Sequence, residues 1–365
     1  MSLLGKALAP GSRIGIIGGG QLGRMLAMAA ARLGFEVLIL TPDLDNCAGE
    51  VAGQVIIGGY TDPDALAQLA QWADVVTFEF ENVPAATLEI LSGLGCPVAP
   101  GAKALAVAQD RVDEKAFLNA SGVPTVDFAP IASLEDLVAA VAKIGAPSLL
   151  KTRRDGYDGK GQVWIENHDL AHLEAAFQWL GERPCILEAP AQFVREVSVI
   201  AARAYEGTVM TYPLGENHHE AGILRRTLAP AQASEAIKDQ AQTIAARILN
   251  ALDYVGVMGV EMFELTDGQL LVNEIAPRVH NTGHWTLDGC EVDQFEQHIR
   301  AIAGWPLGPT HALAQVEMIN LLGAEVLAWR DLAADSRARV WFYGKGEPRP
   351  GRKMGHINRL SPLRP

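Results

Sequence analysis

The sequence predicts an α/β fold that opens with a doubly wound parallel sheet and continues into α+β units. Two patterns support this prediction. Short apolar runs alternate with amphipathic helical segments between residues 13 and 105, with Gly- or Pro-containing loops between them, as in parallel sheets. Farther along, residues 194–274 contain longer runs of strand character, which indicate antiparallel sheets.

The first unit is predicted over residues 1–105. Its first helix has apolar residues at helical spacing, and Gly34 follows its last turn, where glycine commonly ends a helix. The strands are expected at residues 14–17, 37–40, 55–57 and 75–80, and the helices at residues 21–33 and 65–72.

Two further units are predicted over residues 106–188 and 189–365. One continuous helix is expected at 104–120, and a glycine-rich hairpin at 155–161. The other elements of the second unit are helices at 134–144 and 170–181 and strands at 148–152, 162–165 and 185–188. The third unit is expected to contain strands at 194–204, 208–212, 257–264 and 269–274 and a helix at 234–252.

Composition places the chain among ordinary globular proteins. Its 365 residues include 43 acidic and 30 basic side chains, a net charge of −13, and 49% are hydrophobic. The negative charge argues against a general nucleic-acid binder, because neutralising phosphates needs a basic face. Four cysteines without a CxxC pair offer neither a zinc site nor a disulfide framework, which favours a reducing compartment.

No apolar run approaches the roughly 18 residues that a membrane-spanning helix needs. Residues 1–12 lack the apolar core of a signal peptide. We therefore expect a cytoplasmic protein without a membrane partner or a nucleic-acid partner.

Residues 18–23 satisfy the GxGxxG pattern, directly after a predicted strand and at the start of a predicted helix. Such glycines let backbone N–H groups approach an anion at the helix N-terminus. Asp43 follows 20 residues after Gly23, where a ribose-binding acid would lie. The motif leaves three interpretations open, namely a dinucleotide, another phosphate group, or packing of the turn.

Lys151 closes a predicted strand, and a glycine loop at residues 156–161 follows within ten residues. This arrangement indicates a nucleotide site, in which one ammonium contacts phosphate oxygens and the loop N–H groups cover the γ-phosphate. It differs from a P-loop, because no GxxxxGK[ST] precedes a helix. The alternative is a hairpin with favourable turn residues.

Two acids follow apolar runs on neighbouring predicted strands, Glu261 on one and Glu274 on the next, with Asn273 beside the second. Carboxylate and amide oxygens suit a Mg²⁺ ion that bridges phosphates. The alternative is that both acids face solvent or pair with basic side chains. Acids flanked by apolar residues are expected to be partly buried and then need partners, which favours the metal.

Donor groups follow the second acid directly. Arg278 can pair a planar anion bidentately and Asn281 adds a donor, with His280 between them, so the loop is suited to a small oxyanion. The basic run at residues 349–356 either faces solvent or folds back so that Arg352 and Lys353 hold a substrate phosphate.

Five stretches of the chain resemble the ATP-grasp superfamily and, within it, the 5-(carboxyamino)imidazole ribonucleotide synthase family of purine biosynthesis. They occur in the family's order over nearly the whole chain, at residues 18–25, 156–162, 273–281, 283–286 and 349–356. The resemblance implies an ATP-grasp fold with ATP between two α+β domains. The implied domains are an N-terminal Rossmann-like domain at 1–105, a small lid domain at 106–188, and a large C-terminal domain at 189–365 that carries the basic segment.

The resemblance also implies roles for individual residues. Those that would bind ATP are Arg111, Lys151, Gly156, Tyr157, Asp158, Gly159, Lys160, Gly161, Gln162, Glu188, Ala189, Pro190, Ala191, Glu196, His219, Asn273 and Glu274. Those that would contact the aminoimidazole ribonucleotide are Gly20, Gln21, Leu22, Glu79, Tyr157, Asp158, Lys345, Arg352 and Lys353. Those that would hold bicarbonate or act in catalysis are Tyr157, Arg278, His280, Asn281 and Lys353, while Glu261 and Glu274 would bind Mg²⁺.

The implied reaction is the ATP-dependent carboxylation of 5-aminoimidazole ribonucleotide by bicarbonate to 5-(carboxyamino)imidazole ribonucleotide. It would proceed through carboxyphosphate, with release of ADP and phosphate. A homodimer is expected, as is usual in the family. Two alternatives stay open: another ATP-grasp carboxylate–amine ligase, such as a formate-using transformylase, and an NAD(P)-dependent dehydrogenase, which would explain only residues 13–43.

Overall fold

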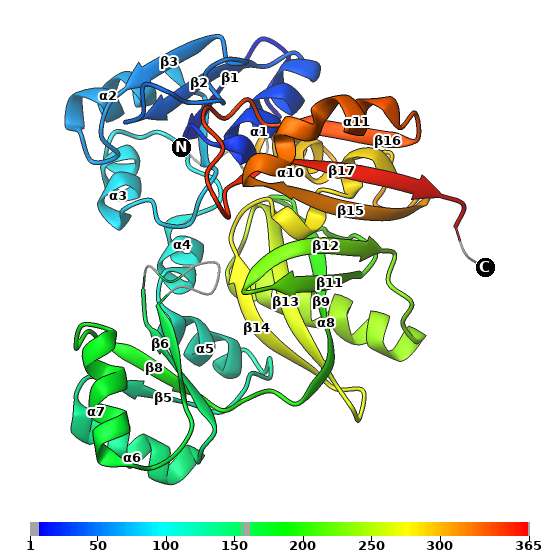
Figure 1. Cartoon of the computed structure of the whole chain (residues 1–365). Helices are drawn as coiled ribbons and strands as arrows, with labels where there is room; N and C mark the ends of the chain where they lie inside the picture. Colours follow the sequence, from blue (N-terminus) through cyan, green and yellow to red (C-terminus); the bar gives the residue numbers. More distant parts are fainter. Residues whose placement is uncertain (1–6, 155, 157–160, 364–365) are drawn as a thin grey trace.

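The structure, a computed structural model, describes residues 7–154, 156 and 161–363. Within this part of the chain the strands form a four-stranded parallel sheet, a four-stranded antiparallel sheet and a nine-stranded sheet. Figure 1 shows the first sheet, in blue, beside the nine-stranded sheet, in green to red. The small antiparallel sheet lies at the lower left of the view, away from the first sheet.

The N-terminal sheet has the strand order β3-β2-β1-β4 and parallel pairings throughout. Ile14 and Ile16 of β1 pack in one core with α1, whereas Ile17 packs in another core with α2, because alternate side chains of a strand point to opposite faces. Helices therefore cover both faces, which confirms the predicted doubly wound sheet. Its elements are β1 (Arg13–Ile17), α1 (Gln21–Arg32), β2 (Glu36–Thr41), β3 (Gln54–Ile57), α2 (Pro63–Trp72), β4 (Val75–Phe78) and α3 (Ala85–Gly93).

The small sheet has the strand order β5-β8-β6-β7. Leu150 and Leu187 of this sheet pack with Leu137 of α6 and Leu173 of α7 in a core that shares no residue with the cores of the other sheets. Its elements are β5 (Phe128–Ile131), α6 (Leu134–Ile144), β6 (Ser148–Thr152), β7 (Gln162–Ile165), α7 (Leu170–Trp179) and β8 (Cys185–Glu188).

The nine-stranded sheet has the order β14-β13-β9-β11-β12-β15-β17-β16, and β10 pairs with β9. Its pairings are antiparallel, as predicted for the later part of the chain. The strands are β9 (Phe193–Arg203), β10 (Val209–Thr211), β11 (Gly215–Glu220), β12 (Ile223–Ala229), β13 (Gly256–Leu265), β14 (Leu270–Ala276), β15 (Gln315–Leu322), β16 (Ala338–Phe342) and β17 (Lys353–Ser361). The helices of this part are α8 (Glu235–Ala251), η1 (Asn281–Gly283), α9 (Thr286–Gly289), α10 (Gln294–Ile302), η2 (Gly323–Ala328) and α11 (Trp329–Ala334).

The structure corrects one predicted helix. Residues 104–120 lie in two helices, α4 (Ala102–Ala108) and α5 (Arg111–Ala120), and not in one. Asp110 separates them, because its carboxylate accepts hydrogen bonds from the N–H groups of Val112 (3.0 Å) and Asp113 (3.4 Å) and so caps α5. The other predicted helices and strands occur within a few residues of their expected ends.

One hydrophobic core joins the N-terminal sheet to the nine-stranded sheet. Leu26 of α1 and Ile39 of β2 belong to the same cluster of buried residues as Val257 of β13 and Ile299 of α10. Helix α1 lies against α10. The N-terminal unit is therefore packed firmly onto the large sheet, whereas the small sheet keeps its own core.

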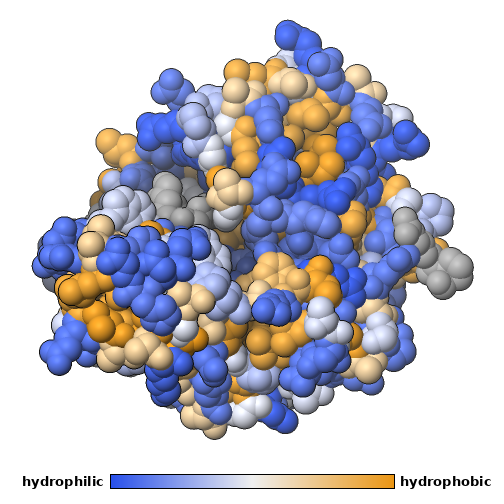
Figure 2. Space-filling view, turned by 60° about the horizontal axis from the view of Figure 1, so that its bottom comes forward, coloured by the Kyte–Doolittle hydropathy of each residue, from blue (hydrophilic) through white to orange (hydrophobic). Residues whose placement is uncertain are grey.

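Among residues 7–154, 156 and 161–363, none of the helices is long and apolar enough to cross a membrane. Figure 2 shows polar side chains over much of one face, with apolar residues in separate patches.

Candidate functional site

A cavity of about 530 Å³ is lined by residues that belong to, or closely follow, strands of all three sheets. It brings together residues that are far apart in the sequence and that were singled out for different reasons. The predicted site residues that line it are Arg111, Lys151, Gly156, Gln162, Glu196, His219, Glu261, Asn273, Glu274, Arg278, His280, Asn281 and Lys353.

The two acids predicted to bind a metal face each other across β13 and β14, where Glu261 pairs in register with Glu274. Burial and the charge of Glu274 raise the pKa of Glu261, because a second negative charge nearby disfavours ionisation. His219 forms an ion pair with Glu196 in the same cavity. Burial alone would lower the pKa of His219, but the hydrogen bond to Glu196 and the surrounding acids raise it.

This acid pair fits a hard divalent cation, whose charge would relieve the repulsion that raises the pKa of Glu261. Within the described part of the chain no group of three or more His, Cys, Asp or Glu side chains is arranged to hold a metal. Two carboxylates are nevertheless enough for Mg²⁺, which usually completes its shell with water and phosphate oxygens.

A pair of lysines lies beside the acids. Glu188 forms an ion pair with both, with Nζ of Lys115 3.3 Å and Nζ of Lys151 2.6 Å from its carboxylate oxygens, and Lys115 donates a hydrogen bond to the carbonyl of Asn273 at 3.1 Å. Burial alone would raise the pKa of Glu188, but the two ammonium groups lower it. Burial lowers the pKa of Lys151, although its pairing with Glu188 opposes this. The side chain of Glu188 thus orients two cations, and Lys115 is a residue that sequence reasoning missed.

Arg111 connects the acid pair to the glycine loop. Its guanidinium lies 3.3 Å from a carboxylate oxygen of Glu274 and donates to the carbonyl of Gly156 at 3.1 Å. Glu114, one turn along α5, is buried and accepts from the N–H of Ile275 at 2.7 Å. Burial raises the pKa of Glu114 to about 8, and the charge of Glu274 adds to this.

The predicted oxyanion loop, residues 278–281, lies at the end of the cavity near Glu261. Arg278 forms a bidentate ion pair with Glu81, in which Nη2 of Arg278 lies 3.0 Å from Oε1 of Glu81. Its bidentate partner in the structure is therefore an acid of the chain itself. Burial alone would raise the pKa of Glu81, but Arg278 lowers it to about 2. Both amide atoms of Asn281 are buried without a hydrogen-bond partner among the described residues, which suits a polar ligand.

His280 carries no charge at neutral pH. Burial lowers its pKa well below the usual value, and the charges of Arg278 and Lys353 act in the same direction. Its Nδ1 lies 2.9 Å from the hydroxyl of Thr282, and its Nε2 lies 3.7 Å from a carboxylate oxygen of Glu261.

The predicted adenine-binding residues are Glu188, which ends β8, and Ala189, Pro190 and Ala191, which follow it, and none of them lines the cavity. Apolar lining comes instead from residues that sequence reasoning missed. Phe193 and Phe263 stack with ring centroids 4.6 Å apart, and Leu149 lies in the same wall. Their place at the ends of apolar strand segments was a usable signal.

The residues predicted to hold the ribonucleotide form a second group, at the N-terminal sheet. Glu79 is buried and accepts hydrogen bonds from the N–H groups of Gly20 and Gly23, the latter at 2.7 Å. A Cβ at Gly20 would lie 2.6 Å from Oε1 of Glu79, so this close approach requires glycine. At Gly20 and Gly23 a carboxylate of the chain itself therefore occupies two amides of the glycine turn.

Lys345 lies near Glu79, and burial lowers its pKa to about 8. Leu22 is buried in the core beneath the turn. Arg352 donates to the carbonyl of Glu347 at 3.2 Å, and Lys353 begins β17 and lines the cavity. The basic run thus folds back onto the site through Lys353. The predicted residues Tyr157, Asp158, Gly159 and Lys160 lie outside the described residues. The described part of the chain resumes at Gly161, which lies next to Thr152.

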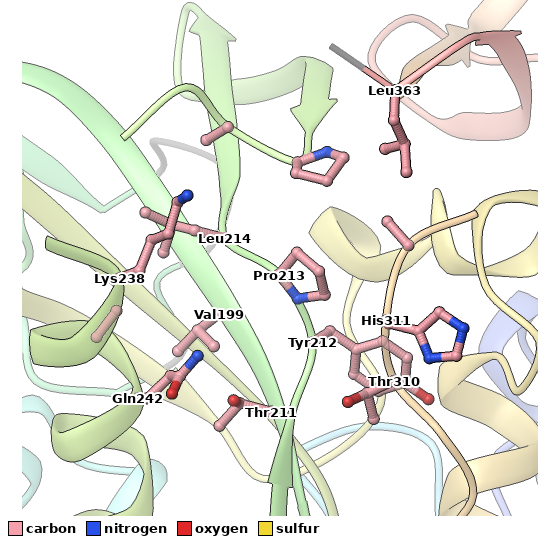
Figure 3. A pocket seen from close by; sticks show the side chains of 14 residues that line it. Val199, Thr211, Tyr212, Pro213, Leu214, Lys238, Gln242, Thr310, His311 and Leu363 are labelled. Carbon is pink, nitrogen blue, oxygen red and sulfur yellow. The ribbon is translucent and has the colours of Figure 1, made fainter. Parts of the chain in front are cut away.

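A second cavity, of about 450 Å³, lies elsewhere and contains none of the predicted site residues. Figure 3 shows Lys238 and Gln242 pointing into it from α8, with Thr310 and His311 on the opposite side and Leu363 above. Its walls carry no pair of charged groups like those of the first cavity.

Three protein-family models match the chain. They are a ribonucleotide synthetase preATP-grasp domain over residues 12–109, an ATP-grasp domain over residues 116–295, and a phosphoribosylaminoimidazole carboxylase C-terminal domain over residues 317–363. These matches confirm the predicted fold class, an ATP-grasp fold preceded by a domain with a parallel sheet.

Known proteins are similar over nearly the whole chain. The N5-carboxyaminoimidazole ribonucleotide synthase of Brucella melitensis is 49% identical over 356 residues, covering 98% of each chain. The crystal structure of an ADP complex of an N5-carboxyaminoimidazole ribonucleotide synthetase has a TM-score of 0.94 at 39% identity, covering 98% of this chain and 95% of the other. The crystal structure of a synthase from Aspergillus clavatus, in complex with ADP and 5-aminoimidazole ribonucleotide, has a TM-score of 0.89 at 31% identity, covering 97% of this chain and 95% of the other.

Proposed function

The chain belongs to the N5-carboxyaminoimidazole ribonucleotide synthase family of ATP-grasp enzymes, and from this membership we propose which of its residues carry out the reaction. It is an ATP-dependent ligase that forms N5-carboxyaminoimidazole ribonucleotide in purine biosynthesis. The observation that carries the residue assignment is the convergence of an acid pair, Lys151 and an oxyanion loop in one cavity.

ATP binds with its phosphates near Lys151 and Arg111, in this proposal, because both cations line the cavity and would offset the charge of a triphosphate. Lys115 is buried in an ion pair with Glu188 and does not line the cavity. The stacked pair Phe193 and Phe263 supplies an apolar wall for the adenine ring. The residues of the glycine loop, which include Tyr157, Asp158 and Lys160, would also bind ATP.

Glu261 and Glu274 would hold Mg²⁺, with the amide oxygen of Asn273 close by. When bound there, the ion supplies charge neutralisation for the phosphate oxygens. Lys151 and Arg111 act on the same oxygens and orient the γ-phosphate for attack, since phosphoryl transfer depends mostly on positioning and electrostatics.

Bicarbonate is held by the oxyanion loop, residues 278–281. Arg278 and the unpartnered amide of Asn281 donate to it, while neutral His280 fills the site without a competing charge. A bicarbonate oxygen attacks the γ-phosphorus, and ADP leaves. The amine of the ribonucleotide then attacks the carboxyl carbon of the resulting carboxyphosphate, the C–O bond to phosphate breaks, and the amine proton leaves with the phosphate. Exclusion of water by the glycine loop protects that intermediate.

The ribonucleotide lies between Glu79 and Lys345 on one side and Lys353 on the other. Lys345, whose pKa burial lowers to about 8, is largely charged at neutral pH and can bind the ribonucleotide phosphate. The same proposal includes the domain boundaries at residues 105 and 188, a homodimer and a cytoplasmic location. Four free, buried cysteines are consistent with a reducing compartment.

An NAD(P)-dependent dehydrogenase is disfavoured, because Glu79 occupies two amides of the glycine turn that would face a dinucleotide pyrophosphate. A formate-using transformylase is disfavoured, because the relatives that match nearly the whole chain are N5-carboxyaminoimidazole ribonucleotide synthases.

An ADP-release assay with ATP, bicarbonate and 5-aminoimidazole ribonucleotide tests the proposal by omission of each substrate in turn. We expect full turnover only with all three, and a fall to background without bicarbonate. Equal turnover with formate in place of bicarbonate would show that the carboxyl donor has been assigned wrongly.

A further inference from the structure

Three buried rings, Tyr343, His356 and His284, contact one another between β17 and the loop that carries η1. We call these three residues the bridge. The hydroxyl of Tyr343 lies 2.8 Å from Nδ1 of His356, and the two imidazole rings stack with centroids 4.8 Å apart. Each of the three residues is at most 2% exposed. The proposed reaction uses none of them.

One end of the bridge is tied to the oxyanion loop. The side-chain amide of Gln294 accepts from the N–H of His280 (2.8 Å) and donates to its carbonyl (2.7 Å). These two bonds determine which amide atom is nitrogen, and that nitrogen lies 3.1 Å from Nδ1 of His284. Nδ1 of His284 must therefore accept, so the ring carries its proton on Nε2.

The other end lies on the segment that reaches the N-terminal domain. Tyr343 is two residues before Lys345, and His356 is three residues after Lys353. The charge of Lys345 acts on Glu79, and a Cβ at the intervening Gly344 would meet the side chains of Arg24 and Glu50. The bridge thus connects the loop that holds bicarbonate to the two lysines on the ribonucleotide side.

Burying the polar rings of the bridge is energetically less favourable than burying apolar rings in their place. Nε2 of His284 and Nε2 of His356 are buried without a hydrogen-bond partner among the described residues. Burial lowers the pKa of His356 to about 3 and that of His284 well below its usual value, so both rings are neutral. Since buried unsatisfied polar atoms are destabilising, apolar rings would make a more stable core, and the polar rings indicate a need for specific geometry.

We propose that the bridge is a positioning element that couples use of ATP to capture of the carboxyl group. This inference rests on the proposed function. By holding the oxyanion loop at a set distance from Lys345 and Lys353, the bridge keeps carboxyphosphate within reach of the ribonucleotide amine. When that distance loosens, water attacks the carboxyl carbon instead, which returns bicarbonate and phosphate, and ATP is consumed without product.

The test is the ratio of ADP released to carboxylated ribonucleotide formed, measured with all three substrates. Tyr343→Phe removes only the hydroxyl that contacts His356, and His356→Phe keeps a ring in the stack. We expect each variant to raise the ratio by about fivefold, the effect of losing one hydrogen bond, while the KM for ATP stays near that of the wild type. The matched control is Tyr254→Phe, which removes an equally buried hydroxyl bonded to the carbonyl of Val257 at 2.8 Å.

A wild-type ratio near one, with Tyr254→Phe unchanged and the bridge variants raised, supports the inference. An unchanged ratio in Tyr343→Phe overturns it, as does an equal rise in Tyr254→Phe, which would point to general core packing. If Tyr343→Phe does not fold, the ratio of His356→Phe decides. A wild-type enzyme that makes no carboxylated ribonucleotide would count against the proposed function instead, so the two failures are distinguishable.

Discussion

At the scale of single residues, Glu274 is the acid on which the proposed metal site most depends. It pairs in register with Glu261 and contacts Arg111. We expect Glu274→Gln to fold normally and to lower ribonucleotide-dependent ADP release by about 10²–10³-fold, because a neutral amide is a poorer ligand for Mg²⁺. Initial rates at saturating ATP and a range of Mg²⁺ concentrations measure this.

The control for Glu274→Gln is Asp267→Asn, which neutralises an acid at the turn between β13 and β14, outside the cavity. That variant should keep wild-type rates. Near-wild-type turnover in Glu274→Gln would remove the metal assignment.

Lys353 is the residue that brings the basic run into the site. We expect Lys353→Ala to raise the KM for the ribonucleotide or for bicarbonate by about tenfold or more, with a smaller effect on ATP, because the loss of a charged contact costs on the order of 1.5–3 kcal/mol. Steady-state kinetics with each substrate varied in turn measure this. Arg359→Ala, on the same strand but paired with Asp335, is the control. A selective loss of ATP affinity would place Lys353 on the nucleotide instead.

Residue types were the easiest part of the site to predict, and partners were the hardest. The acid pair, the oxyanion loop and Lys151 stand out because each has chemically suggestive neighbours in the sequence. Glu81 and Lys115 do not stand out, because their partners Arg278 and Glu188 lie 197 and 73 residues away. A single charged residue in a sequence is interpreted as exposed to solvent, because only the fold shows which residue is its ion-pair partner.

At the scale of elements, α5 links the small domain to β14 through Glu114, whose pKa burial raises from 4.5 to about 8. The folded state therefore keeps a proton that the unfolded state releases, so the free energy of unfolding falls as the pH rises between 4.5 and 8. Glu114→Gln cannot titrate and still accepts from Ile275. Between pH 5 and pH 8 we expect its free energy of unfolding to fall less than that of the wild type, with a difference on the order of 2 kcal/mol.

Urea unfolding of both proteins at pH 5, 6, 7 and 8 measures that difference. Glu174→Gln, which changes an exposed acid on α7, should follow the wild type at every pH. Parallel curves for Glu114→Gln and the wild type would show that Glu114 is ionised in the folded protein.

A clear hydrophobic period made several elements predictable, but α10 and β15, which also have one, were not predicted. Strands β1, β2 and β13 are apolar runs, and α6 and α8 have apolar faces with Ser133 and Ser234 as N-caps. Strand β11 reads Gly-Glu-Asn-His-His-Glu and was missed, because it has no apolar side chain: Asn217 is buried in a hydrogen bond with Thr227, and His219 lines the cavity. The break at Asp110 was missed because helical spacing continues across it.

At the scale of the whole molecule, the distribution of cores predicts how the protein unfolds. Leu26 belongs to a core that spans the N-terminal and nine-stranded sheets, whereas Leu173 belongs to the separate core of the small sheet. Both side chains are at most 1% exposed, so either Leu→Ala change should cost about 2–5 kcal/mol. We expect Leu26→Ala to lower the midpoint temperature of the main thermal transition. Leu173→Ala should lower only the midpoint temperature of a separate transition of the small domain.

Differential scanning calorimetry, with hydrogen exchange of the small-domain peptides, distinguishes the two transitions. The two variants act as each other's control, because residue type and burial are matched. If both variants lowered the midpoint temperature of one common transition equally, the small domain would not be an independent cooperative unit.

The sequence by itself determined the fold class, the order of most helices and strands, and the residue types that do the chemistry, because periodicity, caps and short motifs are local properties. Only the tertiary structure decided which charges neutralise one another: Glu81 with Arg278, Glu188 with two lysines, and Glu79 with the amides of the glycine turn. Hydrogen bonds and ion pairs act over a few ångströms of space, and no spacing along the chain encodes such proximity between residues that are 37 to 197 positions apart.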